Sequence, residues 1–530
     1  MLGILFCTFY ILLFTYIIFK APLFRLQGLN NIYPLVAFYL KLICGVALWY
    51  IYAYHYKNRY TSDIFKYYDD GKLMYSTVHN NFTEFLKMLT GIGDSGSEIS
   101  GYYHQMKSWI NDHDSNLYNN SHFIIRLNAL FMFLSGGHYA VHVIFMCFIA
   151  LAGFSFLYKF FYPYLTSKPK GLFAALFLFP SVLLWTSGIL KECLVIFGLG
   201  LVLYYFNNLK DKKGSTFLNI LLVLAGVILL FEAKAYVLLC IIPCLMSEVF
   251  ISKIIFAQKH PWLTYFFVTG IYIGAGLSID YVAPRYNALQ MLADKQRDMT
   301  RMVRGGIYLA QGRDSDNFAR IDAPDSGKII PANAYSDSLM HHGGLPYITS
   351  SEFCYHEEAT GHIALFKIKA GTPYELIQIS KGDTLHLTAT DTALYRIDVY
   401  AEPAKSKVDI HPMTPTMGSL LAHLPYGLAV ATIRPFPNEI NSAAVGIYFA
   451  ENSIILLLVI AALLLLKKRP EHINIIALCL TYCLLILTLI GLTTPLYGGI
   501  ERYKSVVIPF ILILLLLIYD EEKLKSIFKK

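Results

Sequence analysis

Residues 446–469 read GIYFAENSIILLLVIAALLLLKKR, an apolar stretch that ends in three consecutive cations. The apolar part, 446–466, has the length of about 17–25 residues that an α-helix needs to cross the hydrocarbon core of a bilayer. Positively charged residues collect in cytoplasmic connections. The stretch therefore predicts a membrane-spanning helix whose C-terminal end faces the cytoplasm.

The rest of the chain repeats this pattern. Of 530 residues, 56% are hydrophobic and 15% are charged, whereas a soluble protein is about 45–50% apolar and about 25% charged. The composition excludes a large soluble, fibrous or disordered protein and predicts an α-helical polytopic membrane protein of about 11 transmembrane helices. The predicted spans lie near 2–19, 33–54, 139–158, 171–187, 190–206, 216–231, 235–249, 262–281, 446–466, 473–492 and 503–519.

Every second connection between these spans is basic, which predicts one orientation. The cations that follow alternate spans include Lys20 and Arg25, Lys168 and Lys170, Lys210 to Lys213, Lys253 and Lys259, and Lys467 to Arg469. We therefore expect a multi-pass protein of the plasma (inner) membrane, with its N-terminus outside and its C-terminus in the cytoplasm. Spans one and two occupy 1–54, spans three to eight 139–281, and the last three spans and the tail 446–530.

Two long segments, 55–138 and 282–445, would then face outward. Residues 81–89 carry apolar side chains at helical spacing, which is typical of helices lying in a membrane interface or packed on an outer domain. Residues 282–312 are charged and predicted to be helical. Residues 350–411 alternate apolar and polar side chains between glycine and proline turns, which predicts a small β-rich domain.

Several kinds of site are disfavoured. The net charge of +8 is modest and no basic cluster is interleaved with aromatic residues, so nucleic acid is not an expected partner. His356 and Glu357 begin a zinc-motif pattern, but Thr360 stands where the second histidine would be needed. We predict a surface turn there and no metal site. No cofactor is certain, and a divalent cation is left open.

Ionisable residues predicted near the outer membrane surface are the strongest functional signal, because such groups are costly near lipid. If the spans bundle, these side chains could converge on an anionic group such as a lipid-linked phosphate, which arginine binds in bidentate fashion. The alternative is ordinary snorkelling of long side chains to the headgroups. The candidates for phosphate binding are Arg126, Lys191, Glu192, Lys234, Arg434, Arg502 and Lys504.

Asp63 lies in YTSDIFKYYDDG (60–71), shortly after the second predicted span. Partial desolvation would raise its pKa and neighbouring cations would oppose that rise. Such a carboxylate could accept the proton of an acceptor hydroxyl as a general base. The alternative is a helix N-cap made by Ser62 or Asp63. Asp69 and Asp70 are the next candidates for the base, although both could simply begin a turn.

This layout resembles the GT-C class of integral membrane glycosyltransferases. The resemblance is carried by Asp63 with Tyr67, FPSVLLWTSGILKE (179–192), IRPFP (433–437) and ERYK (501–504). It implies transfer of a sugar from a polyprenyl phosphate or pyrophosphate donor on the outer face of the membrane. The sequence departs from the usual pattern in having an extra first span and no Asp-Glu pair at the first acidic site.

The leading hypothesis is therefore an inverting glycosyltransferase with a polyprenyl-phosphate-linked sugar donor, a glycan, lipid or protein acceptor, and membrane lipids as its surroundings. An O-antigen or exopolysaccharide polymerase or ligase would use similar outer cations. A transporter of lipid-linked glycans is the non-enzymatic alternative. Transporters tend to have inverted repeats and charges at the midplane, and we find no repeat in the sequence.

Overall fold

The chain is an α-helical multi-pass membrane protein. The computed structural model describes residues 2–55, 62–94, 96–109, 120–283, 286–304, 306–311, 318–322, 363–368, 373–378, 383–388, 393–400, 404 and 406–523. In these residues, eight helices are long and apolar enough to cross a membrane. They are α1 (Leu2–Lys20), α2 (Ile32–Tyr50), α7 (Tyr139–Phe161), α10 (Lys191–Lys210), α11 (Thr216–Lys253), α13 (Pro261–Leu277), α16 (Ala443–Leu464) and α17 (Ile473–Thr493).

The expected count of about 11 spans is not reproduced as continuous helices, and the differences have local causes. The predicted span 171–187 consists of α8 (Pro169–Phe177) and α9 (Pro180–Trp185). Phe179 between them is extended, because a residue that precedes proline is disfavoured in the helical region. The predicted span 503–519 is covered by the end of α18 (Tyr497–Lys504) and by the short α19 (Ile508–Ile518).

Helix α11 contains both of the predicted spans 216–231 and 235–249, and it reverses its direction. Lys234 has non-helical backbone angles, φ −156° and ψ 86°. A straight helix of 38 residues would be about 57 Å long. Yet Asn219, near the start of α11, donates to the Lys213 carbonyl, while Glu248, near its end, pairs with Lys210. Both ends of α11 therefore lie beside the same connection, and its two arms run antiparallel.

Glycines let neighbouring helices approach closely, as is common in membrane bundles. Helix α7 meets α10 at Gly153 and Gly200, where a Cβ added to Gly200 would lie 2.5 Å from the Gly153 carbonyl oxygen. Helix α15 (Met417–Thr432) meets α17 in the same way at Gly427 and Gly491. These contacts fix the positions of the bundle helices that carry the candidate site.

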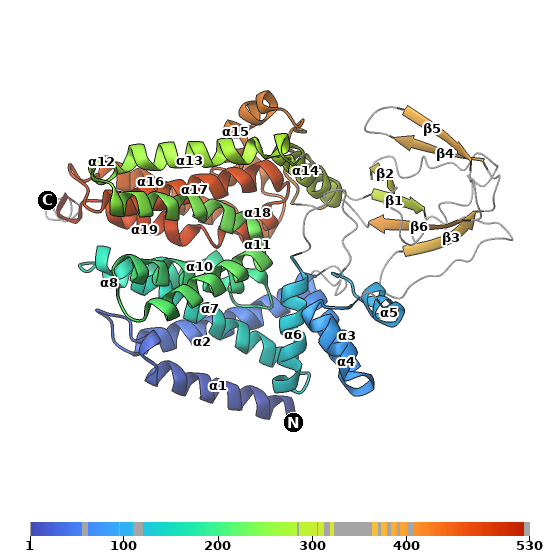
Figure 1. Ribbon diagram of the computed structural model, residues 1–530, viewed down its shortest axis with the longest axis horizontal. Coiled ribbons are helices and arrows are strands. Elements are labelled where there is room, and N and C mark those ends of the chain that lie inside the picture. Colours follow the sequence, from blue (N-terminus) through green and yellow to red (C-terminus); the bar gives the residue numbers. More distant parts are fainter. Residues whose placement is uncertain are drawn as a thin grey trace.

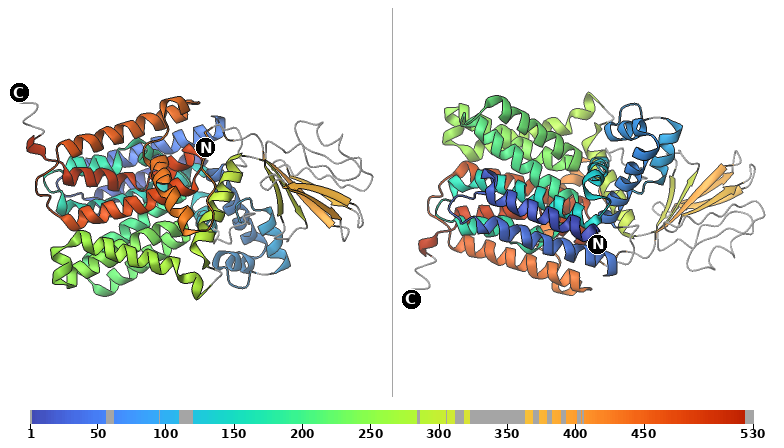
Figure 2. Two further views of the ribbon diagram at one scale, coloured as in Figure 1. Left: turned by 90° about the horizontal axis from the view of Figure 1, so that it is seen from above. Right: turned by 90° about the horizontal axis from the view of Figure 1, so that it is seen from below.

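Four helices lie across one end of the bundle, which we call the site end (Figures 1 and 2). One of them is α4, whose N-terminus is capped by the Asn81 side chain, which accepts hydrogen bonds from the N–H groups of Thr83 and Glu84. Gly91, with φ +72°, follows its last residue. Of the residues 81–89 that were predicted to be helical, α4 contains 82–89, and Asn81 is its cap. The four helices are α3 (Asp63–Asn80), α4 (Phe82–Thr90), α5 (Ser97–Gln105) and α6 (His122–Ser135).

The segment before α16 combines a helix with strands beyond the site end (Figure 1). Helix α14 ends at Arg304, short of the predicted 312, and a strand begins at Gly306. The strands are β1 (Gly306–Gln311), β2 (Phe318–Asp322), β3 (Ile363–Ile368), β4 (Pro373–Gln378), β5 (Asp383–Thr388) and β6 (Ala393–Tyr400). They pair antiparallel in the order β2-β1-β6-β3, with β4-β5 as a separate pair. Much of the predicted β-rich domain, including 350–362, lies outside the described residues.

The remaining helical elements are one helix of 17 residues, α14, and several short ones. They are α12 (Ile255–Lys259), α14 (Ala288–Arg304), a π-helical turn at Ile51–His55, and 3-10 turns at Pro22–Phe24, Tyr162–Tyr164, Ile279–Tyr281 and Pro437–Glu439.

Candidate functional site

Arg502 on α18 connects two carboxylates at the site end. Its Nη1 donates to Oδ2 of Asp63, the first residue of α3, at 2.6 Å, and its Nε donates to Oε1 of Glu192 at 2.8 Å. Glu192 follows Lys191 at the start of α10. Arginine is suited to this arrangement because its guanidinium presents several donors in a rigid plane. One side chain thus links three helices that are far apart in the sequence.

Lys234 brings a second cation to Glu192. Its Nζ lies 2.6 Å from Oε1 of Glu192, the same oxygen that Arg502 contacts. Lys234 reaches this position because it occupies the reversal of α11, where the backbone leaves the helix. The Glu192 side chain is fully buried, and a buried carboxylate is tolerated only when it is paired and hydrogen-bonded. The two cations supply that pairing.

Lys191 faces the same region with different partners. Its Nζ donates to Oδ1 of Asn120 at 2.5 Å and to Oγ of Ser121 at 3.1 Å, and lies 5.2 Å from the centre of the Tyr67 ring. These hydrogen-bond partners are neutral groups, so they do not act as counter-ions to the Lys191 side chain. We call Asp63, Lys191, Glu192, Lys234 and Arg502 the central cluster, which contains three basic and two acidic side chains.

Asp63 is the most accessible carboxylate of the central cluster. Its side chain is 37% exposed, against 12% for Arg502 and none for Glu192. Burial raises the pKa of the Asp63 carboxyl, but Arg502 and Lys66 outweigh that effect and hold the pKa below its ordinary value. Asp63 is therefore ionised at neutral pH, and its carboxylate is partly exposed at the surface of the site end.

The N-cap alternative for Asp63 is not supported by the geometry of α3. Ser62 occupies the N-cap position, but its side chain makes no capping hydrogen bond. Asp63 is the next residue, inside the helix, and its carboxylate is directed at Arg502. The local position of Asp63 at a helix N-terminus still favours a negative charge there, because the helix dipole is positive at that end.

Asp69 and Asp70 serve other contacts. Asp70 is buried and accepts hydrogen bonds from the backbone N–H groups of Lys107 at 2.9 Å and Ser108 at 2.8 Å. Burial raises its pKa to about 6, and the two backbone donors partly oppose the rise. Asp69 lies 3.8 Å from the Lys107 ammonium. Both carboxylates thus attach α3 to the 106–109 loop.

Arg126 on α6 was expected among the phosphate-binding cations, and the structure places it in another contact. Its Nε donates to the Met88 carbonyl at 3.0 Å, and its guanidinium lies 5.3 Å from the centre of the Trp109 ring. Trp109 in turn stacks on His122 at 4.0 Å between ring centres. Arg126 therefore joins α6 to the end of α4.

Arg434 and Lys504 belong to a neighbouring polar group. Lys504 is buried; it pairs with Glu501 at 3.0 Å and donates to Asn452. The Asn452 amide donates to Glu501 at 2.9 Å and to the Arg434 carbonyl at 2.8 Å. The Arg434 guanidinium pairs with Glu439 and donates to the Tyr426 hydroxyl. This group holds the start of α16 against α18, beside the central cluster.

The sequence reasoning missed Lys41 of α2. Lys41 is fully buried and donates to Oγ1 of Thr186 at 2.5 Å and to the Thr186 carbonyl at 3.2 Å. Thr186 ends α9, where backbone carbonyls lack helical partners. Lys41 thereby stabilises the break that precedes Lys191. A single lysine inside an apolar span is the signal that could have identified it.

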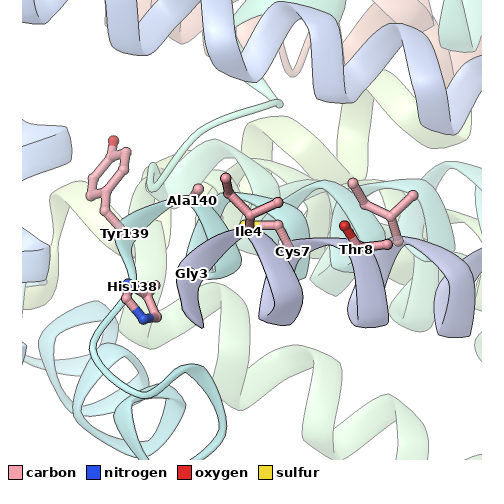
Figure 3. Close-up of a pocket in the computed structure, with 8 residues that line it drawn as sticks. Gly3, Ile4, Cys7, Thr8, His138, Tyr139 and Ala140 are labelled. Atoms are coloured by element: carbon pink, nitrogen blue, oxygen red, sulfur yellow. The ribbon is translucent and has the colours of Figure 1, made fainter. Parts of the chain in front are cut away.

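A surface cavity lies away from the central cluster. It lies between α1 and the start of α7, where Figure 3 shows Cys7, Thr8, His138 and Tyr139. Within the described part of the chain, no group of three or more His, Cys, Asp or Glu residues could hold a metal ion. His356, Glu357 and Thr360 lie outside that part. No protein-family model, curated protein or solved structure matches the chain.

Proposed function

We propose that this protein is an inverting, GT-C-like membrane glycosyltransferase that transfers a sugar from a polyprenyl-(pyro)phosphate donor to a glycan, lipid or protein acceptor. One observation carries the proposal. A partly exposed carboxylate, Asp63, lies within 2.6 Å of Arg502 at the end of a membrane-spanning bundle. Lys191 and Lys234 stand beside the same pair. A base and several cations are therefore side by side where a lipid-linked phosphate would meet a water-soluble acceptor.

The cations account for binding of the donor. A phosphate that approaches Asp63 and Arg502 would meet the three basic side chains of the central cluster. Arg502 can offer its guanidinium to two phosphate oxygens, and Lys191 can offer an ammonium that is bound only to neutral oxygens. When the bond between the anomeric carbon and the phosphate oxygen breaks, the phosphate keeps the electron pair and gains negative charge. Fixed cations stabilise this developing charge.

Asp63 accounts for activation of the acceptor. In the structure Arg502 holds the pKa of Asp63 below its ordinary value, which makes the carboxylate a weak base. A phosphate that draws Arg502 away would weaken this restraint, and burial would then raise the pKa. Asp63 could take the proton of the acceptor hydroxyl while its oxygen bonds to the anomeric carbon on the face opposite the phosphate. The anomeric configuration would invert.

Topology supports a reaction on the outer face. Basic connections at the opposite end of the bundle contain Lys210, Lys213 and Lys467, which the charge rule places in the cytoplasm. In this proposal the two arms of α11, the pair α8 and α9, and the pair α18 and α19 each complete a crossing. The chain would then cross the plasma membrane eleven times, with the site end outside and the C-terminus in the cytoplasm.

A transporter of lipid-linked glycans is the second candidate, and one feature favours it. The break between α9 and α10 places non-helical backbone next to the buried Lys41, and transporters often bind substrate at broken helices. The Lys41 ammonium is already bound to both Thr186 oxygens, however. The charged side chains of the central cluster lie at one end of the bundle and not at its middle, which favours an enzyme.

Transfer from a purified donor tests the proposal. Wild type and Asp63→Asn, in lipid nanodiscs, would be given a labelled polyprenyl-phosphate sugar and a mixture of cell-envelope acceptors, with and without a chelator of divalent cations. We expect transfer by wild type and a loss of about 10²–10⁴-fold in Asp63→Asn. Asp69→Asn is the matched control and should keep the wild-type rate. Activity only with a donor that carries an oligosaccharide would indicate a polymerase or ligase, and movement of the lipid without transfer would indicate a transporter.

A further inference from the structure

A groove lies at the surface of the bundle. It has a volume of about 440 Å³ and lies between the first three turns of α1 and residues 138–140 at the start of α7 (Figure 3). This volume is in the range of ligand-binding sites, about 300–1,000 Å³. Gly3 contributes to the space, because a Cβ there would lie 3.0 Å from the His138 ring.

The lining of the groove suits an apolar ligand. No charged side chain lines it; its polar groups are Thr8, His138 and Tyr139. Ile4, at its rim, is 75% exposed, and the neighbouring Leu5 is 67% exposed. Because α1 is long and apolar enough to span a membrane, these exposed side chains face hydrocarbon. The groove is thus continuous with the surface that the bilayer covers.

Tyr139, which lines the groove, packs on the face of α3 opposite to the one that carries Asp63. Tyr139 contacts the rings of Phe65 at 5.4 Å and Tyr68 at 5.2 Å between centres. Asp63 and Tyr67 are directed instead toward Arg502 and Lys191. A lipid whose phosphate occupied the central cluster would have to bend around α3 to reach the groove. The occupant of the groove is therefore a different molecule from one bound at the cluster.

We propose that the groove holds one acyl chain of a bilayer phospholipid, as a resident ligand of the protein. The acyl chain would pack along α1 and behind the Tyr139 ring. Tyr139 packs on Phe65 and Tyr68, so the bound acyl chain would stabilise the position of α3, the helix that carries Asp63. This inference rests on the shape and position of the groove and does not depend on the proposed reaction.

Retention of lipid tests this inference. Wild type, Thr8→Trp and Leu5→Trp would be purified in mild detergent, and bound lipids would be counted by native mass spectrometry. The Thr8→Trp indole would fill the groove, whereas Leu5→Trp places the same bulk on the exposed side of α1. We expect one phospholipid per protein in wild type and Leu5→Trp, and a loss of at least tenfold in Thr8→Trp. Equal retention by all three, no retention by wild type, or retention of a polyprenyl lipid would overturn the proposal.

A second measurement does not depend on the variants. Wild type in nanodiscs would be illuminated with phosphatidylethanolamine that carries a photoreactive diazirine in its acyl chain, and the labelled peptides would be identified. Labelling should concentrate on residues 3–11 and 138–140, and excess unlabelled phosphatidylethanolamine should reduce it. Labelling spread evenly over the lipid-facing helices would contradict a resident chain.

Discussion

The Nη1 atom of Arg502 lies 2.6 Å from Oδ2 of Asp63, although 439 positions separate the two residues in the chain. Arg502 is also held by Glu192, so its guanidinium is oriented from two sides before any ligand binds. Side chains oriented in this way need little reorganisation when charge develops on a bound group. The pair joins α3, the first helix of the site end, to the last part of the bundle, and it is the centre of the proposed reaction.

The guanidinium of Arg502 should increase the rate of transfer by more than a positive charge alone would. Arg502→Ala should slow transfer by about 10²–10³-fold, as removal of one donor to a developing anion does. Arg502→Lys should recover only part of this loss, because a lysine ammonium cannot donate to Asp63 and Glu192 with the planar geometry of arginine. Initial rates at several donor concentrations would separate binding from turnover. Full activity of Arg502→Lys would show that a point charge is sufficient.

The same substitution should change the pH dependence of transfer. Arg502 lowers the pKa of Asp63 against the effect of burial, so Arg502→Ala should raise that pKa. A base must be unprotonated, and the rate therefore falls as the pH drops below its pKa. The acid limb of the rate profile should move to higher pH in Arg502→Ala and less in Arg502→Lys. An unchanged acid limb would show that another group is the base.

Sequence reasoning found the membrane class and much of the central cluster for the same reason. Charged residues such as Lys191 and Lys234 are conspicuous at the ends of apolar runs, because lipid excludes them. Their partners could not be predicted, since the contact between Asp63 and Arg502 depends on how α3, α10 and α18 pack. The backbone hydrogen bonds that engage Asp70 arise in the same way, from the tertiary fold.

Helix boundaries were harder to predict than apolar runs. Hydropathy alone treats 171–187 as one span, although Pro180 divides it. Hydropathy also predicts the two arms of α11 as separate spans, but it does not show that the Lys234 side chain between them pairs with Glu192. Arg126 resembled the other cations in its position before a span, but its contacts with Met88 and Trp109 are set by the folding of the helices at the site end.

Asp70 should make stability depend on pH. Its pKa in the folded protein is about 6, above the ordinary value of about 3.9. The folded state therefore binds the proton more tightly, so this contribution is fully present below about pH 4 and is lost as the pH rises through about 6. A shift of about two units corresponds to roughly 3 kcal/mol. Thermal unfolding of wild type and Asp70→Asn between pH 4 and 8 would measure it.

The Asp70→Asn variant should show a flatter dependence of melting temperature on pH than wild type over the range 4–6. Asp69→Asn is the control, because Asp69 is a neighbour on the same helix and its contact is a longer one with Lys107. Its curve should parallel that of wild type. Parallel curves for all three proteins would mean that Asp70 does not titrate in this range.

Orientation in the membrane can be tested with introduced cysteines. Gly96→Cys lies before α5, where a Cβ meets no atom within 4 Å, and Lys213→Cys lies in the connection after α10. If the site end faces outward, a membrane-impermeant thiol reagent should label Gly96→Cys in intact cells and Lys213→Cys only after permeabilisation. Wild type provides the background from native cysteines. The reverse pattern would overturn the orientation and a reaction on the outer face.

Glu192 should be a major contributor to the stability of the bundle. One of its oxygens accepts from Lys234 at 2.6 Å and from Arg502 at 2.8 Å. Glu192→Gln keeps the size of the side chain but leaves the two cations without their shared counter-charge. Loss of one partner from a buried ion pair costs about 3–5 kcal/mol. We expect a clearly lower melting temperature in detergent, measured by the loss of monodisperse protein on heating.

A double substitution separates the ion pair from the packing of Glu192. Lys234→Met removes one of the two cations while it keeps a long apolar side chain, and Arg502 retains Asp63 as a partner. Glu192→Gln combined with Lys234→Met should therefore be less destabilised than the sum of the single variants, because fewer buried charges remain unpaired. Strict additivity of the two effects would show that Glu192 and Lys234 do not stabilise each other, and that Arg502 alone accounts for the burial of the Glu192 carboxylate.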